Sequence, residues 1–191
     1  MDEGLIIKRA QEGDLDAFEE IIGRYKKSVY NLCLRMLYNR NEAEDVAQEA
    51  FIKIYKGLRS YNGKSKFSTW VLKITSNACI DFMRKRKMNT VPIEDYRTSD
   101  GGIEDTSNSP ESSYMAYELK KEVEVAVKSL PEKYRMMIIY YHFMNLSYKE
   151  ISDILNEPMT IVKNRLYRAR LMLRNKLMDR EKGYNGLQSN I

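Results

Sequence analysis

Apolar residues recur at steps of three and four positions along most of this chain, and polar residues fill the positions between them. Such spacing predicts amphipathic helices. It runs from Leu5 to Tyr38 with a break at Gly13-Asp14, from about Glu42 to Leu58, and again from Phe67 to Lys87. Because no stretch alternates between apolar and polar residues as a half-buried strand does, the sequence predicts an all-α fold.

The C-terminal half shows a short helix, a tight turn and a longer helix. Ser147 can cap the first of these helices, and Glu150, three residues later, can bond back to the cap. Asn156 ends that helix, and Pro158 suits the first turn of the next one, because its missing N–H has no partner there. The longer helix has an apolar stripe of Val162, Leu166, Ala169, Leu173 and Leu177. We therefore predict a helix-turn-helix, the motif whose second helix enters the DNA major groove.

The remaining surface of that second helix is strongly basic, and no acid occurs from Thr160 to Met178. Its bases are Lys163, Arg165, Arg168, Arg170, Arg174 and Lys176. Arg and Lys suit the guanine acceptors and Asn suits adenine. The residues that point away from the stripe and can reach base edges are Lys163, Asn164, Tyr167 and Arg168. The alternative is a solvated helix whose charges serve only solubility, but such faces usually mix both signs.

A segment rich in Pro, Gly, Ser and Asp separates the two helical halves. Residues 88–114 contain one base, Arg97, and six acids, namely Glu94, Asp95, Asp100, Glu104, Asp105 and Glu111. This composition predicts a flexible acidic linker rather than part of a core. We predict one small helical domain over residues 1–87, a second over residues 115–178, and a frayed tail over residues 179–191.

The formal net charge is +5, and because the linker is acidic the two helical domains are more basic than the whole. That balance indicates a polyanionic partner. The longest apolar run, near Met136 to Met144, is about half as long as a membrane span. The N-terminus lacks the order of a signal peptide, so we predict a cytoplasmic protein without membrane insertion. Cys33 and Cys79 lie among apolar neighbours and are predicted to be reduced core thiols.

Nothing in the sequence indicates catalysis. The chain has one histidine, no cluster of metal ligands and no glycine-rich phosphate loop. We therefore predict neither an enzyme, such as a nuclease, nor a bound metal or cofactor.

Three features of the N-terminal half allow two interpretations each. Asp45, Gln48 and Glu49 share the outer face of a predicted helix, which is either a solvated acidic surface or a docking face. Trp70 either anchors the core or offers a ring on which single-stranded bases stack. The bases of Arg84–Lys87 either interact with the helix dipole or hold phosphates.

Five segments together resemble the extracytoplasmic-function (ECF, group 4) sigma factors of bacterial RNA polymerase, within the sigma-70 family. The resemblance covers nearly the whole chain, from about Leu5 to Met178. The segments are GDLDAFEEIIGRY (13–25), EAEDVAQEAFIKIY (42–55), FSTWVLKITSNACIDFMRKRK (67–87), SLPEKYR (129–135) and LSYKEISDILNEPMTIVKNRLYRAR (146–170). Five such segments, in the family's order and spacing, imply a sigma2-like domain followed by a sigma4-like one.

The resemblance implies a role for each surface. The residues that would dock on the clamp helices of the largest polymerase subunit are Asp45, Gln48 and Glu49. Those that would capture a flipped base of the −10 element are Tyr61, Asn62, Lys64, Lys66, Phe67, Trp70 and Asn77. Phosphates there would be held by Arg84, Lys85, Arg86 and Lys87. The −35 element would be read as duplex by Lys163, Asn164, Arg165, Tyr167 and Arg168.

The resemblance also implies that the acidic linker threads the RNA-exit channel of the polymerase. It further implies an anti-sigma factor that keeps the protein inactive by covering its binding surfaces. The chain departs from the family's usual Pro-x-Gly-Thr-Val-Lys-Ser-Arg, because Thr160, Ile161 and Asn164 stand at the Gly, Thr and Ser positions. Since Thr160 has a Cβ, the turn must avoid a positive φ there.

The competing hypothesis is a stand-alone helix-turn-helix regulator that binds duplex operators as a dimer. It explains the C-terminal half but leaves the acidic face and the Trp70 helix without a role. A sigma factor should bind its promoter poorly alone and well with core polymerase. A repressor should bind alone with a palindromic footprint.

Overall fold

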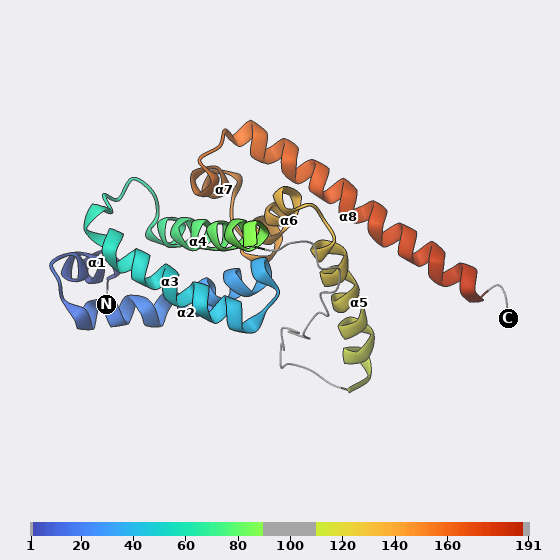
Figure 1. Ribbon diagram of the computed structural model, residues 1–191, viewed down its shortest axis with the longest axis horizontal. Coiled ribbons are helices and arrows are strands. Elements are labelled where there is room, and N and C mark those ends of the chain that lie inside the picture. Colours follow the sequence, from blue (N-terminus) through green and yellow to red (C-terminus); the bar gives the residue numbers. More distant parts are fainter. Residues whose placement is uncertain (1, 90–109, 189–191) are drawn as a thin grey trace. The chain divides into compact units, whose positions relative to one another are not determined.

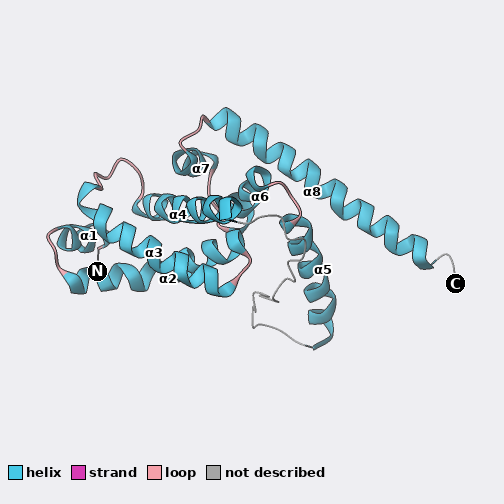
Figure 2. Cartoon of the chain, viewed as in Figure 1, coloured by secondary structure: helices cyan, strands magenta, loops and turns pink. Residues whose placement is uncertain are grey.

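The computed structural model of the chain describes residues 2–89 and 110–188, with side chains for residues 2–88 and 118–178. Every regular element in these ranges is helical (Figure 2), which confirms the predicted all-α fold. The chain forms two compact units, the first built from α1–α4 and the second mainly from α5–α8 (Figure 1).

Four helices make up the part of the first unit within residues 2–89. They are α1 (Glu3–Gln11), α2 (Leu15–Leu37), α3 (Arg40–Gly57) and α4 (Phe67–Asn89), and a 3-10 turn, η1 (Leu58–Ser60), follows α3. Helices α2, α3 and α4 each pack against the other two, and α1 packs on α2. The buried residues between them include Ile21, Val29, Leu32, Val46, Ala50, Ile54, Val71 and Ala78. The apolar stripes of the sequence therefore face one shared core.

Local backbone chemistry sets the starts of α2 and α3, and α3 begins at Arg40, two residues before the predicted Glu42. Gly13 separates α1 from α2 with a φ of 100°, which residues with a Cβ rarely adopt. The Asp14 side chain caps α2 by accepting a hydrogen bond from the Ala17 N–H at 3.1 Å. Asn39 caps α3 in the same way, through the Glu42 N–H at 3.1 Å. Each cap satisfies a backbone donor that the first helical turn leaves without a partner.

Cys33 on α2 and Cys79 on α4 meet inside the first unit. Their sulfur atoms lie 3.6 Å apart, and both residues are buried free thiols. The hydrogen bond that Cys79 donates to Cys33, together with burial, raises the pKa of the Cys79 thiol. Because the thiolate is the reactive form, this environment keeps Cys79 unreactive, as predicted for a core thiol.

The second unit is assembled on its longest helix. Its elements are α5 (Pro110–Lys128), α6 (Glu132–Ile138), the π-helical turn η2 (Ile139–Phe143), α7 (Tyr148–Leu155) and α8 (Met159–Gln188). Both α5 and α6 pack against α8. The buried residues of this unit include Ala126, Val127, Leu130, Met137, Ile138, Val162, Leu166 and Ala169.

A π-helical turn, η2, follows directly after α6. The Met144 N–H donates to the Ile139 carbonyl at 2.9 Å, five residues back, and the Leu146 N–H donates to the Tyr140 carbonyl at 3.0 Å. Such turns often occur at functional sites. The spacing of apolar residues does not distinguish one π turn from an α-helical turn, so this feature required the structure.

Three helices are longer than predicted. Helix α4 continues to Asn89, α5 begins at Pro110, and α8 continues to Gln188. The ends of the predicted linker and most of the predicted tail are therefore helical. Gly183 and Gly186 each disfavour a helix by about 1 kcal/mol but, unlike proline, remove no backbone hydrogen bond. The rest of the predicted linker, residues 90–109, and residues 189–191 lie outside the described residues.

Candidate functional site

The helix-turn-helix begins with the predicted capping box. The Ser147 N–H donates to the Glu150 carboxylate at 2.9 Å, and the Glu150 N–H donates to the Ser147 hydroxyl oxygen at 3.2 Å. This reciprocal pair satisfies donors at the start of α7 and fixes where the helix begins. The sequence prediction for this helix start is confirmed.

The turn between α7 and α8 is closed by its own polar groups. Asn156 ends α7 with a φ of 53°. The Ser152 hydroxyl donates to the Glu157 carbonyl at 2.6 Å, and the Glu157 N–H donates to the Ser152 carbonyl at 3.2 Å. Thr160 already lies within α8, and the positive φ falls on Asn156 instead. The Cβ of Thr160 is therefore accommodated without strain, as the sequence requires.

The first turns of α8 separate a buried face from an exposed one. Val162, Leu166 and Ala169 are buried, whereas Leu173 and Leu177 are half-buried. The exposed residues on the other side are Lys163, Asn164, Tyr167 and Arg168. Tyr167 is 69% exposed, which is unusual for a large aromatic ring that only stabilises a fold. The structure thus places four of the five predicted −35 residues together on one open surface.

Arg165, the fifth, lies elsewhere. Its guanidinium forms a two-point ion pair with Glu157 of the turn, at 3.1 Å to Oε1 and 2.9 Å to Oε2. The side chain of Arg165 is only 25% exposed. The sequence grouped Arg165 with the exposed bases because they are neighbours along the chain. Its position on α8, however, points its side chain toward Glu157 in the loop between α7 and α8. Arg165 therefore holds the helix-turn-helix together rather than extending the open surface.

A row of rings and cations supports α8 and was missed in the sequence. The rings of Tyr141 and Tyr148 stack with centroids 5.2 Å apart. The Lys163 ammonium lies 5.8 Å from the Tyr148 centroid, and the Arg170 guanidinium lies 4.7 Å from the Tyr141 centroid. Cations over ring faces are attracted by the ring quadrupole. The row therefore links η2, α7 and α8 and orients Lys163 of the exposed surface.

His142 joins the end of that row. The Arg170 Nε–H donates to His142 Nε2 at 3.2 Å, so that nitrogen must carry no proton. Burial, and then the Arg170 charge, lower the pKa of His142 below its ordinary value. The neutral imidazole is therefore part of the folded arrangement.

The first unit carries the predicted acidic face on α3. Asp45, Gln48 and Glu49 are all exposed, and the neighbouring Ile52 is 54% exposed. Glu49 forms an i,i+4 ion pair with Lys53 at 2.8 Å. Exposed acids beside an exposed apolar side chain occur in protein-binding surfaces as well as in surfaces that only face solvent.

The loop from Tyr61 to Lys66 has a defined backbone. The Lys64 N–H donates to the Asn62 side chain at 3.2 Å, and Gly63 takes a φ of 73°. The Tyr61 hydroxyl donates across the loop to the Ser65 carbonyl at 2.7 Å. These bonds close the loop on itself and leave Asn62, Lys64 and Lys66 on the surface.

An aromatic cluster lies beneath this loop. Phe67 contacts Tyr61, Trp70 and Tyr25, with centroid distances of 5.1, 5.5 and 5.5 Å. Phe67 is only 2% exposed, so it presents no ring face to a base and the prediction that it captures one is not supported by its position. Tyr61 and Trp70 are half-buried. Trp70 thus packs against the core with part of its ring and exposes the rest, and the buried Phe67 ring stacks against it.

Tyr25 extends the cluster to the start of the chain. Its hydroxyl donates to the Glu3 carboxylate at 2.6 Å. Burial, followed by this hydrogen bond to an anion, raises the pKa of the Tyr25 hydroxyl. Neither residue was expected near the loop, because a contact over 22 positions leaves no trace in helical spacing.

Three residues predicted to bind the −10 element recur on α4 at intervals of seven positions. Trp70, Asn77 and Arg84 therefore lie along one side of the helix, two turns apart. Asn77 and Arg84 are exposed. The loop and this side of α4 form a strip that runs from an aromatic ring through an amide to a guanidinium.

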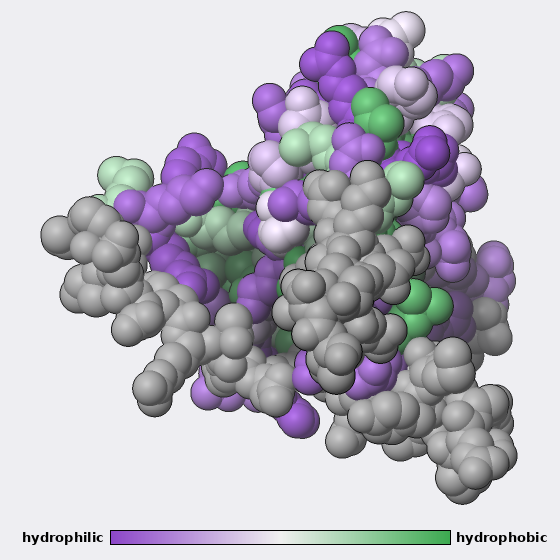
Figure 3. All heavy atoms as spheres, turned by 90° about the vertical axis from the view of Figure 1, so that its right-hand side faces the viewer, coloured by the Kyte–Doolittle hydropathy of each residue, from purple (hydrophilic) through white to green (hydrophobic). Residues whose placement is uncertain are grey.

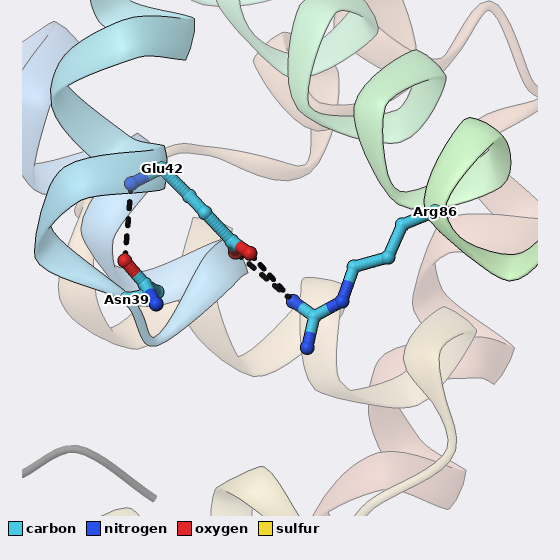
Figure 4. A network of polar contacts seen from close by, with 3 residues as sticks. All are labelled: Asn39, Glu42 and Arg86. Carbon is cyan, nitrogen blue, oxygen red and sulfur yellow. Dashed lines mark hydrogen bonds and ion pairs between the residues drawn. The ribbon is translucent and has the colours of Figure 1, made fainter. Parts of the chain in front are cut away.

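The four bases at the end of α4 do not act alike. Arg86 reaches across to α3 and pairs with Glu42, while Asn39 caps the same turn (Figure 4). Arg84 pairs with Asp81 on its own helix. Lys85 and Lys87 are exposed. The structure therefore separates Arg86, which joins two helices, from the lysines predicted with it to hold phosphates.

The described surface is mostly hydrophilic on the face drawn in Figure 3, with apolar side chains lying among polar ones. No described helix is both long and apolar enough to cross a bilayer. Within the same part of the chain, no group of three or more His, Cys, Asp or Glu could hold a metal ion.

Comparison with known proteins finds two families in order. The sigma-70 region 2 family matches residues 21–88, and the sigma-70 region 4 family matches residues 120–173. The ECF RNA polymerase sigma factor SigW of Bacillus subtilis (strain 168) is 39% identical over 178 residues, covering 91% of this chain and 95% of that protein. The ECF RNA polymerase sigma-E factor of Escherichia coli (strain K12) is 34% identical over 178 residues, covering 91% and 93%.

Solved structures share the fold. CnrH, determined in complex with the cytosolic domain of CnrY, superposes with a TM-score of 0.66 at 19% identity, covering 92% of this chain and 96% of CnrH. The sigma factor RpoE in complex with the anti-sigma factor NepR from Bartonella quintana gives 0.62 at 19% identity, covering 84% and 96%. Because the two regions occur in order and relatives match along 91% of its length, the chain belongs to the ECF sigma factors of RNA polymerase, within the sigma-70 family.

Proposed function

We propose that this alternative sigma factor binds core RNA polymerase through α3 and reads two promoter elements, one with each unit. The observation that carries the proposal is the exposed surface of α8, where Lys163, Asn164, Tyr167 and Arg168 project from a helix held by a capped α7 and a closed turn. The polymerase makes the RNA, and this chain chooses where synthesis begins.

The −35 element is read as duplex DNA by these four residues. A helix of this width fits the major groove, where each base pair presents a distinct pattern of donors and acceptors. Lys163 and Arg168 suit guanine, and Asn164 suits adenine. Arg165 contributes indirectly, because its ion pair with Glu157 sets the angle between the turn and α8.

The −10 element is read as a single strand by the strip on the first unit. A base inside a duplex hides its edges, so it must leave the stack before a protein pocket can bind it. Asn62 and Asn77 offer amides to such a base, and the half-buried Trp70 offers a ring for stacking. Lys85 and Lys87 supply exposed charges for the backbone phosphates.

The clamp helices of the largest polymerase subunit are the proposed partner of the α3 face. Asp45 and Glu49 provide charge that steers a basic partner into register, and Ile52 provides apolar contact at the same place. An anti-sigma factor that covers one of these surfaces would keep the protein from the polymerase. The acidic linker would occupy the RNA-exit channel, and the site of action would be the cytoplasm.

Run-off transcription with purified core polymerase tests the proposal. The chain should bind promoter fragments weakly alone, and with core polymerase it should direct a discrete transcript and protect both promoter elements from cleavage. Tight binding of the chain alone to a palindromic duplex, with no effect of core polymerase, would instead identify a stand-alone helix-turn-helix regulator.

A further inference from the structure

Gln11, the last residue of α1, bonds to the start of the Tyr61–Lys66 loop. Its side-chain amide donates to the Leu58 carbonyl at 3.0 Å and to the Tyr61 carbonyl at 2.8 Å. An amide nitrogen has two N–H groups, and this geometry uses both. The two bonds span 47 and 50 residues of sequence, so they fasten the N-terminal helix to the point where the chain leaves η1.

The bond to Tyr61 continues into the rest of the loop. Gln11 fixes the Tyr61 backbone, and the Tyr61 hydroxyl in turn donates to the Ser65 carbonyl at 2.7 Å. The same Tyr61 ring packs on Phe67 and Trp70, with centroids 5.1 and 5.3 Å away. If Gln11 moved, Tyr61 would move with it. Both the loop and the packing against the Trp70 ring would then change.

Helix α1 is itself held in place on the first unit. Ile6, Ile7 and Ala10 bury its inner face, and Glu3 accepts a hydrogen bond from Tyr25 at 2.6 Å. The helix precedes the segment that matches sigma-70 region 2, which begins at residue 21. The support for the loop thus comes from a part of the chain that this region does not include.

We propose that Gln11 is a positioning residue for −10 recognition, acting through the Tyr61 backbone. The inference rests on the proposed function, in which this loop and Trp70 receive an unstacked base. Recognition of a flipped base depends on groups held close to the productive geometry before the base arrives. Without the two Gln11 bonds, the loop keeps its internal bonds but loses its fixed place over Trp70.

The test is promoter selection by the full chain in holoenzyme. Core RNA polymerase with each sigma variant transcribes a pool of templates that carry randomised −10 and −35 boxes and a transcribed barcode, and the RNA is sequenced. Gln11→Leu and Gln11→Met both remove the two donors while keeping an apolar side chain of useful length. Glu12→Ala, an exposed neighbour at the end of the same helix, is the matched control.

We expect both Gln11 variants to lose about tenfold in preference among −10 sequences, the size expected from one to two hydrogen bonds. Preference at −35 should be unchanged, and Glu12→Ala should behave as wild type in both boxes. Amide hydrogen exchange of residues 62–66 should become faster in the Gln11 variants, since the loop would open more often.

Three results would overturn the inference, and they differ from failure of the proposed function. Full −10 preference in both folded variants would show that the loop needs no support from Gln11. Equal losses at −10 and −35 would show that Gln11 only stabilises the protein. Unchanged exchange in residues 62–66 would remove the mechanism. If the wild-type chain selects neither box with core polymerase, the proposed function itself fails.

Discussion

Arg86 near the end of α4 donates to both carboxylate oxygens of Glu42 in the first turn of α3, at 3.2 and 2.9 Å (Figure 4). The Glu42 N–H is itself bonded to the Asn39 side chain, so the start of one helix and the end of another share a single network. The Arg86 side chain is 36% exposed and that of Glu42 25%. Arg86 therefore acts between helices, although it lies within a run of four bases.

Replacing Arg86 by Ala should lower the free energy of unfolding by about 1 kcal/mol, a figure that allows for partial exposure of the pair. Glu42→Ala should cost a similar amount, and the double variant should cost less than the sum, because both changes remove one interaction. Denaturant unfolding of the four chains measures this. Strictly additive losses would show that the pair contributes nothing to stability.

The exposed lysines of the same run should show the opposite behaviour. Lys85→Ala should leave the unfolding free energy nearly unchanged, and Lys85→Ala and Lys87→Ala should each weaken promoter opening by holoenzyme. Each lost contact to single-stranded phosphate should reduce the slope of log affinity against log salt by about 0.7. Promoter binding measured over a salt series checks this, and an unaltered slope would mean that the lysines only complement the helix dipole.

Arg168 and Arg165 offer a matched pair on α8. Arg168→Ala should weaken −35-dependent transcription by about 1–3 kcal/mol and relax the choice of base, because the side chain is exposed on the surface proposed to enter the groove. Its unfolding should be unchanged. Arg165→Ala should instead destabilise the second unit, since Glu157 would lose its partner. Run-off transcription on −35 variants and thermal unfolding separate the two effects, and equal behaviour of both variants would contradict the assignment.

Charge reversal on α3 tests the polymerase-binding face. Asp45→Lys together with Glu49→Lys should reduce binding to core polymerase at least tenfold and lower the melting temperature only slightly, because both residues are exposed and the Glu49–Lys53 pair lies at the surface. Glu12→Lys together with Glu19→Lys, two exposed acids outside α3, makes the same change in net charge and serves as the control. Affinity for core polymerase and thermal unfolding are the measurements. Intact holoenzyme assembly by the double variant would remove this role.

His142 should make the second unit sensitive to mild acid. Its pKa is lower in the folded chain than its ordinary value of about 6.5. As the pH falls below that value, the unfolded chain binds the proton first, so stability decreases until the folded-state pKa is passed. His142→Gln can still accept from Arg170 and should remove this dependence. Melting temperatures of both chains between pH 7.5 and 5.5 test the expectation, and parallel curves would contradict it.

The sequence by itself determined several features that depend only on neighbours along the chain. The Gly13 break, the Ser147 capping box and the end of α7 at Asn156 each follow from local backbone chemistry, and the structure confirms them. Helical spacing likewise separated the buried stripe of α8 from its exposed bases, except that it grouped the half-buried Arg165 with them. These signals suffice because a helix places residues three and four apart on one face.

Only the tertiary structure decided which of those polar and aromatic residues are free to meet a partner. It turned Arg86 toward Glu42, buried Phe67 beneath Tyr61, and brought Gln11 to a loop 50 residues away. Spacing along the chain gives the face on which a side chain lies but not what packs against that face. Such contacts depend on how separate helices dock, and that is settled by the packing of the whole core.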